Sequence, residues 1–266
     1  MSCTVVTAYF ELPYKKHSSN SYKQWISNYL KTTDGNMVIF TSESTLPMLK
    51  EYREDKMGKT KFITLELTDF YTYRFWKYWK RDHQRDHERG HHNPYLYMIW
   101  AEKSMFIKKA MDLNPFNSEF YCWTDIGMVR EEQQIQHINK FPRSVILDRL
   151  KRDKVYLLNI DDFTQQELQS SLISEKFRFL NTARIGGGVI LGHKDVLPRW
   201  IELFYDMLNH FIDKDFFAGK DQSLMAFVYL QNKDLIELIK PINSPIDPWF
   251  YLLYYFGNKN YTETLL

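Results

Sequence analysis

The stretch Phe120-Tyr121-Cys122-Trp123-Thr124-Asp125-Ile126-Gly127-Met128-Val129-Arg130 decides how the chain is interpreted. Its first residues are mostly apolar and β-prone, which predicts a buried strand, and a carboxylate and a glycine follow directly. A carboxylate at the exit of a buried strand in an open α/β sheet faces the crevice in which such sheets bind ligands. Two interpretations are open: Asp125 reaches a hard cation beside a bulky ligand, or the Asp-x-Gly pair is a plain turn.

Apolar strands and helices alternate along the chain, which favours a doubly wound sheet. The sequence predicts strands at residues 3–10, 37–41, 61–67, 120–124, 155–160 and after the glycines of 184–192. It predicts helices at about 20–30, 46–53, 94–111, 131–139, 198–211 and 224–230. There is no linker or internal repeat, so we expect one α/β domain over residues 1–266, with a mixed, mostly parallel sheet flanked by helices.

The composition narrows the class of protein. With 266 residues, 44% of them hydrophobic, the chain can bury a large core. The net charge of +2 gives little attraction for nucleic acid or acidic membranes, so no nucleic-acid partner is expected. Cys3 and Cys122 lie in apolar runs and are predicted to be buried thiols rather than a disulfide framework. No apolar run is long enough to span a bilayer, and we expect a soluble, cytoplasmic protein without a transmembrane segment.

The segment 70–92 is aromatic at first and then charged. Four of the eight histidines fall between Lys80 and His92. His83 and His87 are four apart, so on a helix they would share a face and could bind a metal, although no complete tetrahedral set follows. The alternatives are a solvated segment, a lid whose basic side chains reach phosphates, and a surface for single-stranded nucleic acid.

Three further features lie in the predicted elements. Asn93-Pro94 is typical of a helix start, and Lys103 falls in the middle of the apolar face of that helix. An unpaired buried ammonium is costly, so Lys103 either extends along the helix edge to water or points into a site, toward a phosphate or Asp125. The glycines at 186–188 predict a bulge or a close approach by another group. Asp221 precedes a helix and could be its N-cap.

Together these residues resemble the HtrL/WlaTC family, whose members look like glycosyltransferases of the GT-A class. The motifs that carry the resemblance are Asn93-Pro94-Tyr95-Leu96-Tyr97, Trp100-x-x-Lys103, Asn114-Pro115-Phe116, Trp123-Thr124-Asp125-Ile126-Gly127 with Arg130, Gly187-Gly188 and Asp221-Gln222. The resemblance implies a single GT-A-like domain, with a nucleotide-binding half at about 1–130 and a sugar and acceptor half at about 131–266. The implied donor is a nucleotide diphosphate sugar, first of all a UDP-sugar, and the implied acceptor is a hydroxyl of a saccharide or glycoconjugate.

The resemblance also implies roles for individual residues. Asp125 stands in the acidic metal motif, with Mn²⁺ or Mg²⁺ as the expected ion, although Gly127 takes the place of a second carboxylate. The residues implied to hold the donor are Thr7, Ala8, Tyr9, Ser42, Glu43, Lys103, Trp123, Thr124, Gly187 and Gly188. The implied catalytic pair is Asp221-Gln222: Asp221 is the base if configuration inverts, and either residue stabilises an oxocarbenium-like state if it is retained. These assignments require Lys103, Asp125 and Asp221 to converge. The missing carboxylate keeps open a second reading, a nucleotide-sugar-binding protein without turnover.

Overall fold

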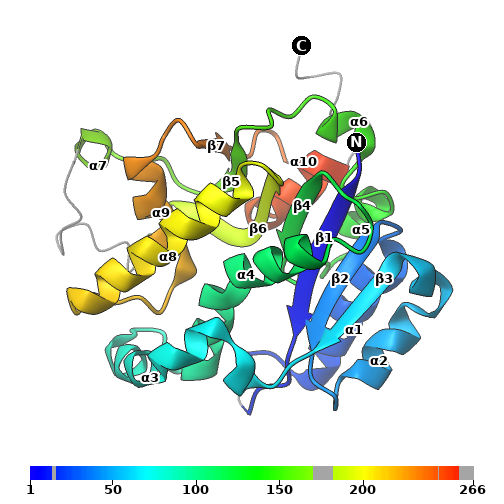
Figure 1. Ribbon diagram of the computed structural model, residues 1–266, viewed down its shortest axis with the longest axis horizontal. Coiled ribbons are helices and arrows are strands. Elements are labelled where there is room, and N and C mark those ends of the chain that lie inside the picture. The colour runs from blue at the N-terminus through cyan, green and yellow to red at the C-terminus, as the bar shows by residue number, and fades with distance from the viewer. Residues whose placement is uncertain (14–15, 170–181, 245, 258–266) are drawn as a thin grey trace.

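The computed structural model describes residues 1–13, 16–169, 182–244 and 246–257, and these residues form one sheet covered on both faces (Figure 1). The strands are β1 (Cys3–Tyr9), β2 (Asn36–Thr41), β3 (Thr60–Thr64), β4 (Phe120–Thr124), β5 (Val155–Asn159), β6 (Ile185–His193) and β7 (Ile236–Ile239). Their order is β3-β2-β1-β4-β6-β5-β7. β6 is antiparallel to β4 and β5, and the other neighbouring pairs are parallel. The predicted mixed, mostly parallel sheet is confirmed.

Helices pack on both sides of this sheet, as Figure 1 shows. They are α1 (Ser19–Thr32), α2 (Leu46–Tyr52), α3 (Trp76–Arg85), α4 (Pro94–Leu113), α5 (Glu132–Ile138), α6 (Ser144–Leu147), α7 (Gln165–Gln169), α8 (Leu197–Asp213), α9 (Asp221–Gln231) and α10 (Tyr251–Gly257). Short 3₁₀ turns are η1 (Glu54–Lys59), η2 (Leu67–Asp69), η3 (Tyr71–Phe75) and η5 (Pro248–Phe250). In this set of residues, no helix combines the length and apolar character needed to cross a membrane.

The central strands are buried on both faces, which explains their continuous apolar sequences. Successive side chains of a strand point to opposite faces, so Val6 of β1 belongs to the apolar cluster that includes residues of α4 and α8, and Val5 to the cluster that includes residues of α1 and α10. β2 divides in the same way, with Phe40 in the first cluster and Ile39 in the second. One sheet therefore separates two apolar cores.

The first half of the sheet has a reversal of strand order at β1. The chain passes from β1 to β2 and β3 on one side, then returns through α4 to place β4 on the other side of β1. α1 packs on one face of the sheet and α4 on the other. In open α/β sheets, ligands bind beyond the carboxyl ends of the strands at such a reversal. Asp125 directly follows β4 and so stands at this position.

Several predicted boundaries are wrong in ways that bear on the site. The sequence offers Ser19 or Asn20 as the cap of α1, but the N-cap is Ser18, whose hydroxyl accepts from the amide of Ser21 at 3.1 Å. The glycines at 186–188 lie inside β6 rather than before it. α3 ends at Arg85, so His87 is outside the helix and the predicted shared face of His83 and His87 does not exist.

Candidate functional site

The ammonium of Lys103 joins three elements of the fold. Its Nζ lies 3.1 Å from Asp125 Oδ1 and 2.9 Å from Asp221 Oδ2, and it donates to the carbonyl of Gly187 at 2.9 Å. These partners come from the end of β4, the first residue of α9 and the interior of β6. Lys103 sits mid-helix in α4, whose N-cap is Asn93 as predicted. Thus the structure brings together the residues that the sequence analysis expected to converge.

Lys103 is a buried cation held by its partners. Its side chain is 3% exposed, so it does not extend along the helix edge to water, and that alternative is wrong. Burial alone lowers the pKa of an ammonium, but the carboxylates of Asp125 and Asp221 more than offset this effect, and the pKa of Lys103 is raised. The lysine therefore remains charged at neutral pH.

The Asp125 carboxylate has one occupied and one accessible side. Its Oδ1 faces Lys103 and also accepts from the indole nitrogen of Trp123 at 2.8 Å. Its backbone amide donates to the carbonyl of Gly188 at 2.9 Å, which fixes the residue beyond the end of the strand. The side chain is nonetheless 40% exposed. Asp125 can therefore present its second oxygen to a ligand while the first stays bound.

Two glycines of β6 make room for this arrangement. A Cβ on Gly187 would lie 2.7 Å from Asp221 Oδ2, closer than real side chains approach, so only glycine lets that carboxylate reach Lys103. A Cβ on Gly188 would lie 3.1 Å from the terminal methyl of Met128 and 3.8 Å from Asp125 Oδ2. The predicted close approach at the glycines is thus an approach by the protein's own acidic side chain.

Asp221 is buried and lies at the start of α9. It is the first helical residue and Lys220 is the N-cap, so the N-cap prediction for Asp221 is wrong. Its Oδ1 accepts from the amide of Gln222 at 2.9 Å. Burial raises the pKa of Asp221, against the opposing effect of Lys103. Gln222 is partly exposed beside it.

The remaining predicted donor residues fall into two groups. Thr7 and Thr124 are fully buried, and Thr7 Oγ1 donates to the carbonyl of Thr124 at 2.7 Å, which ties β1 to β4. The Thr124 hydroxyl also bonds to the hydroxyl of Tyr29. These two side chains hold the sheet together, so their predicted contact with a donor has no support from their surroundings.

The second group lies at the carboxyl ends of β1 and β2. Ala8 and Tyr9 are partly exposed at the end of β1. Ser42 bonds to the hydroxyls of Ser44 and Thr45 within the turn after β2, and Glu43 is exposed. Their position at the strand ends is compatible with a ligand, and their contact with a nucleoside stays a prediction.

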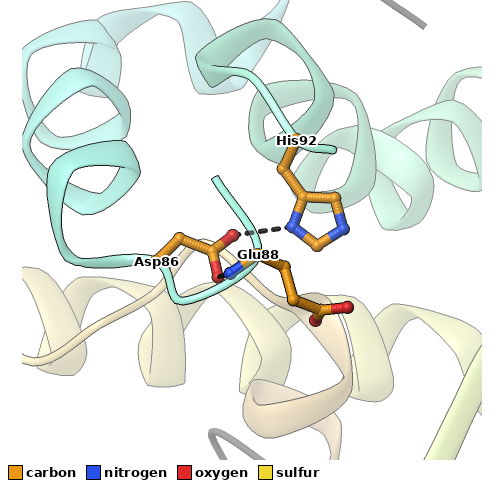
Figure 2. Close-up of side chains that lie close together, drawn as sticks. All are labelled: Asp86, Glu88 and His92. Atoms are coloured by element: carbon orange, nitrogen blue, oxygen red, sulfur yellow. Dashed lines mark hydrogen bonds and ion pairs between the residues drawn. The ribbon is translucent and has the colours of Figure 1, made fainter. Parts of the chain in front are cut away.

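A separate group of metal-ligating side chains lies between α3 and α4. Within the described ranges, Asp86, Glu88 and His92 bring one ligand atom each to within 4.8 Å of one another (Figure 2). Sequence reasoning looked for a helical pair of histidines here and missed this set. The usable signal was the Asp-x-Glu-x-x-x-His spacing inside the histidine-rich segment. This group does not include Asp125.

Comparison with known proteins places the chain in a family. The family model described as "Bacterial protein of unknown function (HtrL_YibB)" matches residues 1–257, and the chain belongs to that family. No curated protein gives a significant match.

Two solved structures show a distant similarity. One is mouse xyloside xylosyltransferase 1 in its apo form, with 11% identity, a TM-score of 0.47, and coverage of 90% of this chain and 85% of that one. The other is 4-diphosphocytidyl-2C-methyl-D-erythritol synthase from Anaerococcus prevotii DSM 20548, with 8% identity, a TM-score of 0.42, and coverage of 96% and 95%.

Proposed function

We propose that this protein is a glycosyltransferase that moves a sugar from a nucleotide diphosphate sugar to a hydroxyl of a saccharide or glycoconjugate. A UDP-sugar is our first candidate for the donor. The observation that carries the proposal is the convergence of Lys103, Asp125 and Asp221 beyond the carboxyl end of β4. That end adjoins the reversal of strand order at which open α/β sheets bind ligands.

Sugar transfer needs stabilisation of the leaving diphosphate. Positive charge that is fixed in a water-poor site stabilises a developing negative charge much more strongly than the same charge in water. Lys103 is the buried, protonated group that would supply such a charge when it turns from Asp221 toward the phosphates. In the proposal its ammonium faces the diphosphate, and Ala8, Tyr9, Ser42 and Glu43 contact the nucleoside in the half formed by residues 1–130.

Asp221 is the proposed base if configuration inverts. A general base works best when its pKa lies near the operating pH, and burial moves the pKa of Asp221 upward from its ordinary value. The backbone at Gly187 and Gly188 would face the sugar, although Asp221 Oδ2 and the Met128 methyl fill the space that a Cβ would take at these two positions. Gln222, which is partly exposed, would orient the ring. If configuration is retained, Asp221 and Gln222 instead stabilise positive charge at the anomeric carbon.

A divalent cation fits Asp125 only as a single-carboxylate site. Asp125 Oδ1 is engaged by Lys103 and Trp123, which leaves Oδ2 for an ion. Gly127 supplies no second carboxylate, and a Cβ there would lie 3.8 Å from the Trp25 ring, on the side of α1. Mg²⁺ in proteins is often held by one or two carboxylates with substrate phosphates as further ligands. Mn²⁺ or Mg²⁺ would thus be held by Asp125 together with the donor, and would neutralise the leaving diphosphate.

The test is Asp125→Asn. We expect transfer to fall at least about a hundredfold and nucleotide binding to weaken, because the variant loses the charge that would hold the cation and that also pairs with Lys103. A thermal-shift screen of UDP-, GDP- and CMP-sugars, with and without Mn²⁺, first identifies the donor. Transfer is then measured as UDP release from a panel of UDP-sugars with saccharide acceptors. Asp112→Asn is the matched control, since that carboxylate is exposed and pairs only locally with Lys108. Full activity in Asp125→Asn would remove the proposed role.

A nucleotide-sugar-binding protein without turnover is the second candidate. The absent carboxylate at Gly127 favours it, together with the internal ion pair that occupies Asp221. Release of free UDP from a bound UDP-sugar at a rate above the uncatalysed one would exclude it.

A further inference from the structure

The connection between α3 and α4 folds back on itself around one carboxylate. Asp86 is the C-cap of α3 and is 5% exposed. Its Oδ1 accepts from the amide of Glu88 at 2.9 Å, and its Oδ2 accepts from the hydroxyl of Tyr97 at 2.6 Å. His92 Nδ1 lies 2.6 Å from the same Oδ2. Residues 86–92 therefore form a tight loop in which the Asp86 carboxylate points at the His92 ring, and the Glu88 side chain extends past that ring (Figure 2).

A second contact fixes the shape of this loop independently of those three side chains. His83 Nε2 lies 3.2 Å from the carbonyl of Arg89 and 3.1 Å from that of His92. His83 thus holds the far side of the loop against α3. The fold of the loop thus positions Asp86 and His92, whereas the carboxylate of Glu88 is held by Lys220.

We propose that Asp86, Glu88 and His92 form a binding site for a transition-metal dication such as Zn²⁺. Carboxylate oxygen and imidazole nitrogen are zinc ligands, and three protein ligands with a water as the fourth is a common set. Ligand atoms at about 2.0–2.1 Å from a tetrahedral ion lie roughly 3.3 Å apart. The Asp86–His92 separation of 2.6 Å must therefore open by somewhat less than an ångström, as the ion replaces the hydrogen that the two atoms share. This site is independent of the proposed transfer chemistry.

The third ligand is already paired with a cation. Lys220 Nζ lies 2.5 Å from Glu88 Oε2, and this bond lowers the pKa of Glu88. A metal ion would compete with the lysine for the same carboxylate. Because Lys220 directly precedes Asp221, occupation of the site would alter the contact that ties the loop 86–92 to the start of α9.

Other contacts on this side of the molecule would remain in place. Asp82 is buried in α3 and accepts from the amide of Ala218 at 2.7 Å. Arg85 pairs with Asp215 at 2.7 Å. A metal would therefore break the contact between Lys220 and Glu88, while the contacts of Asp82 with Ala218 and of Arg85 with Asp215 persist.

The test uses the full chain, free of added histidines and treated with chelator, and measures binding of Zn²⁺ alone by calorimetry at neutral pH. We expect one site, which Co²⁺ also fills with the intense visible absorption of a tetrahedral complex. His92→Gln and Glu88→Gln should each weaken zinc binding at least about tenfold. Lys220→Met should strengthen it severalfold, because the variant removes the competing ammonium.

The control is the double variant His87→Asn/His91→Asn, which removes the two exposed imidazoles of the same segment. It should bind zinc like the parent chain. No zinc binding by the parent, or binding that is lost in the control and unchanged in His92→Gln, would overturn the site and reduce the cluster to a hydrogen-bond network. An unchanged affinity in Lys220→Met would remove Glu88 from the ligand set. Circular dichroism checks that each variant is folded.

Discussion

The sharpest prediction concerns Lys103→Met, which keeps most of the aliphatic side chain and removes the charge. The parent lysine is the buried partner of two carboxylates of different exposure. Asp125 is 40% exposed, so water solvates it when the ammonium is lost, at little cost. Asp221 is 5% exposed and would be left as an unpaired buried charge. The effect on stability should therefore come from Asp221.

The size of that effect has an upper limit, because Asp221 can take up a proton. Protonation costs about 1.4 kcal/mol for each pH unit between the ordinary pKa of an aspartate, 3.8, and the pH of the solution. At pH 7 the limit is about 4 kcal/mol, which agrees with the 3–5 kcal/mol typical of removing one partner of a buried ion pair. Typical domains are stable by about 5–15 kcal/mol, so the variant should fold but unfold at a much lower urea concentration.

The pH dependence of the stability lost in Lys103→Met shows whether Asp221 causes that loss. In the variant, the folded state holds a proton on Asp221 that the unfolded state releases above the ordinary pKa of 3.8. Burial raises the pKa of Asp221 in the parent as well, so parent and variant differ little up to that raised pKa, and above it the stability lost by the variant grows by about 1.4 kcal/mol per unit as pH rises. At pH 5 the loss should therefore stay below about 1.6 kcal/mol and be clearly smaller than at pH 7. Urea titrations of parent and variant at pH 5, 6 and 7 measure this slope.

A second substitution separates charge from packing. Lys103→Met/Asp221→Asn should recover most of the lost stability at pH 7, because the amide needs no counter-charge. If Lys103→Met is as stable as the parent at pH 7, or if its loss is the same at pH 5 and pH 7, Asp221 is not paired with a buried ammonium and the site described above is wrong.

Two further predictions concern neighbouring residues. Burial raises the pKa of Glu102 from 4.5 to about 7, so the protein should lose stability as pH rises from about 4.5 to 7, and Glu102→Gln should remove that part of the slope in urea titrations. Gly187→Ala places a Cβ 2.7 Å from Asp221 Oδ2 and should cost about 1–3 kcal/mol by thermal unfolding. Gly58→Ala has open space around it and is the control, with a change expected within about 0.5 kcal/mol.

The sequence narrowed Lys103 to two alternatives, the helix edge or a site containing Asp125, because the physical constraint on a buried ammonium is strong. An ammonium in the middle of an apolar helix face must find partners or reach water, and Asp125 at a strand exit was an available partner. The alternation of apolar strands with helices likewise predicted the sheet, since strands buried on both faces have little freedom in composition. These features depend on local sequence and on the cost of burial.

Features that depend on the pairing of distant segments were harder to predict. The antiparallel direction of β6 places Gly188 beside Asp125 and Gly187 beside Asp221. The sequence of residues 184–192 alone does not indicate with which strands they pair. The ion pair of Asp221 is of the same kind, because its partner Lys103 lies in α4, far away in the sequence. No helix was predicted over residues 76–85, so α3 and its end at Arg85 were both missed.

The charge balance of the site constrains any ligand that it binds. With both carboxylates ionised, Lys103, Asp125 and Asp221 together carry one net negative charge, and the ammonium is already shared between its two partners. A diphosphate brings further negative charge, so it would be repelled unless positive charge accompanies it or Lys103 turns from Asp221 toward the phosphates. The exposed oxygen of Asp125 is the position at which an accompanying cation could bind, and it offers too few ligands to hold that cation alone. Cation and donor should therefore bind cooperatively, each raising the affinity for the other. This expectation rests on the single available carboxylate and holds for any donor that carries a diphosphate.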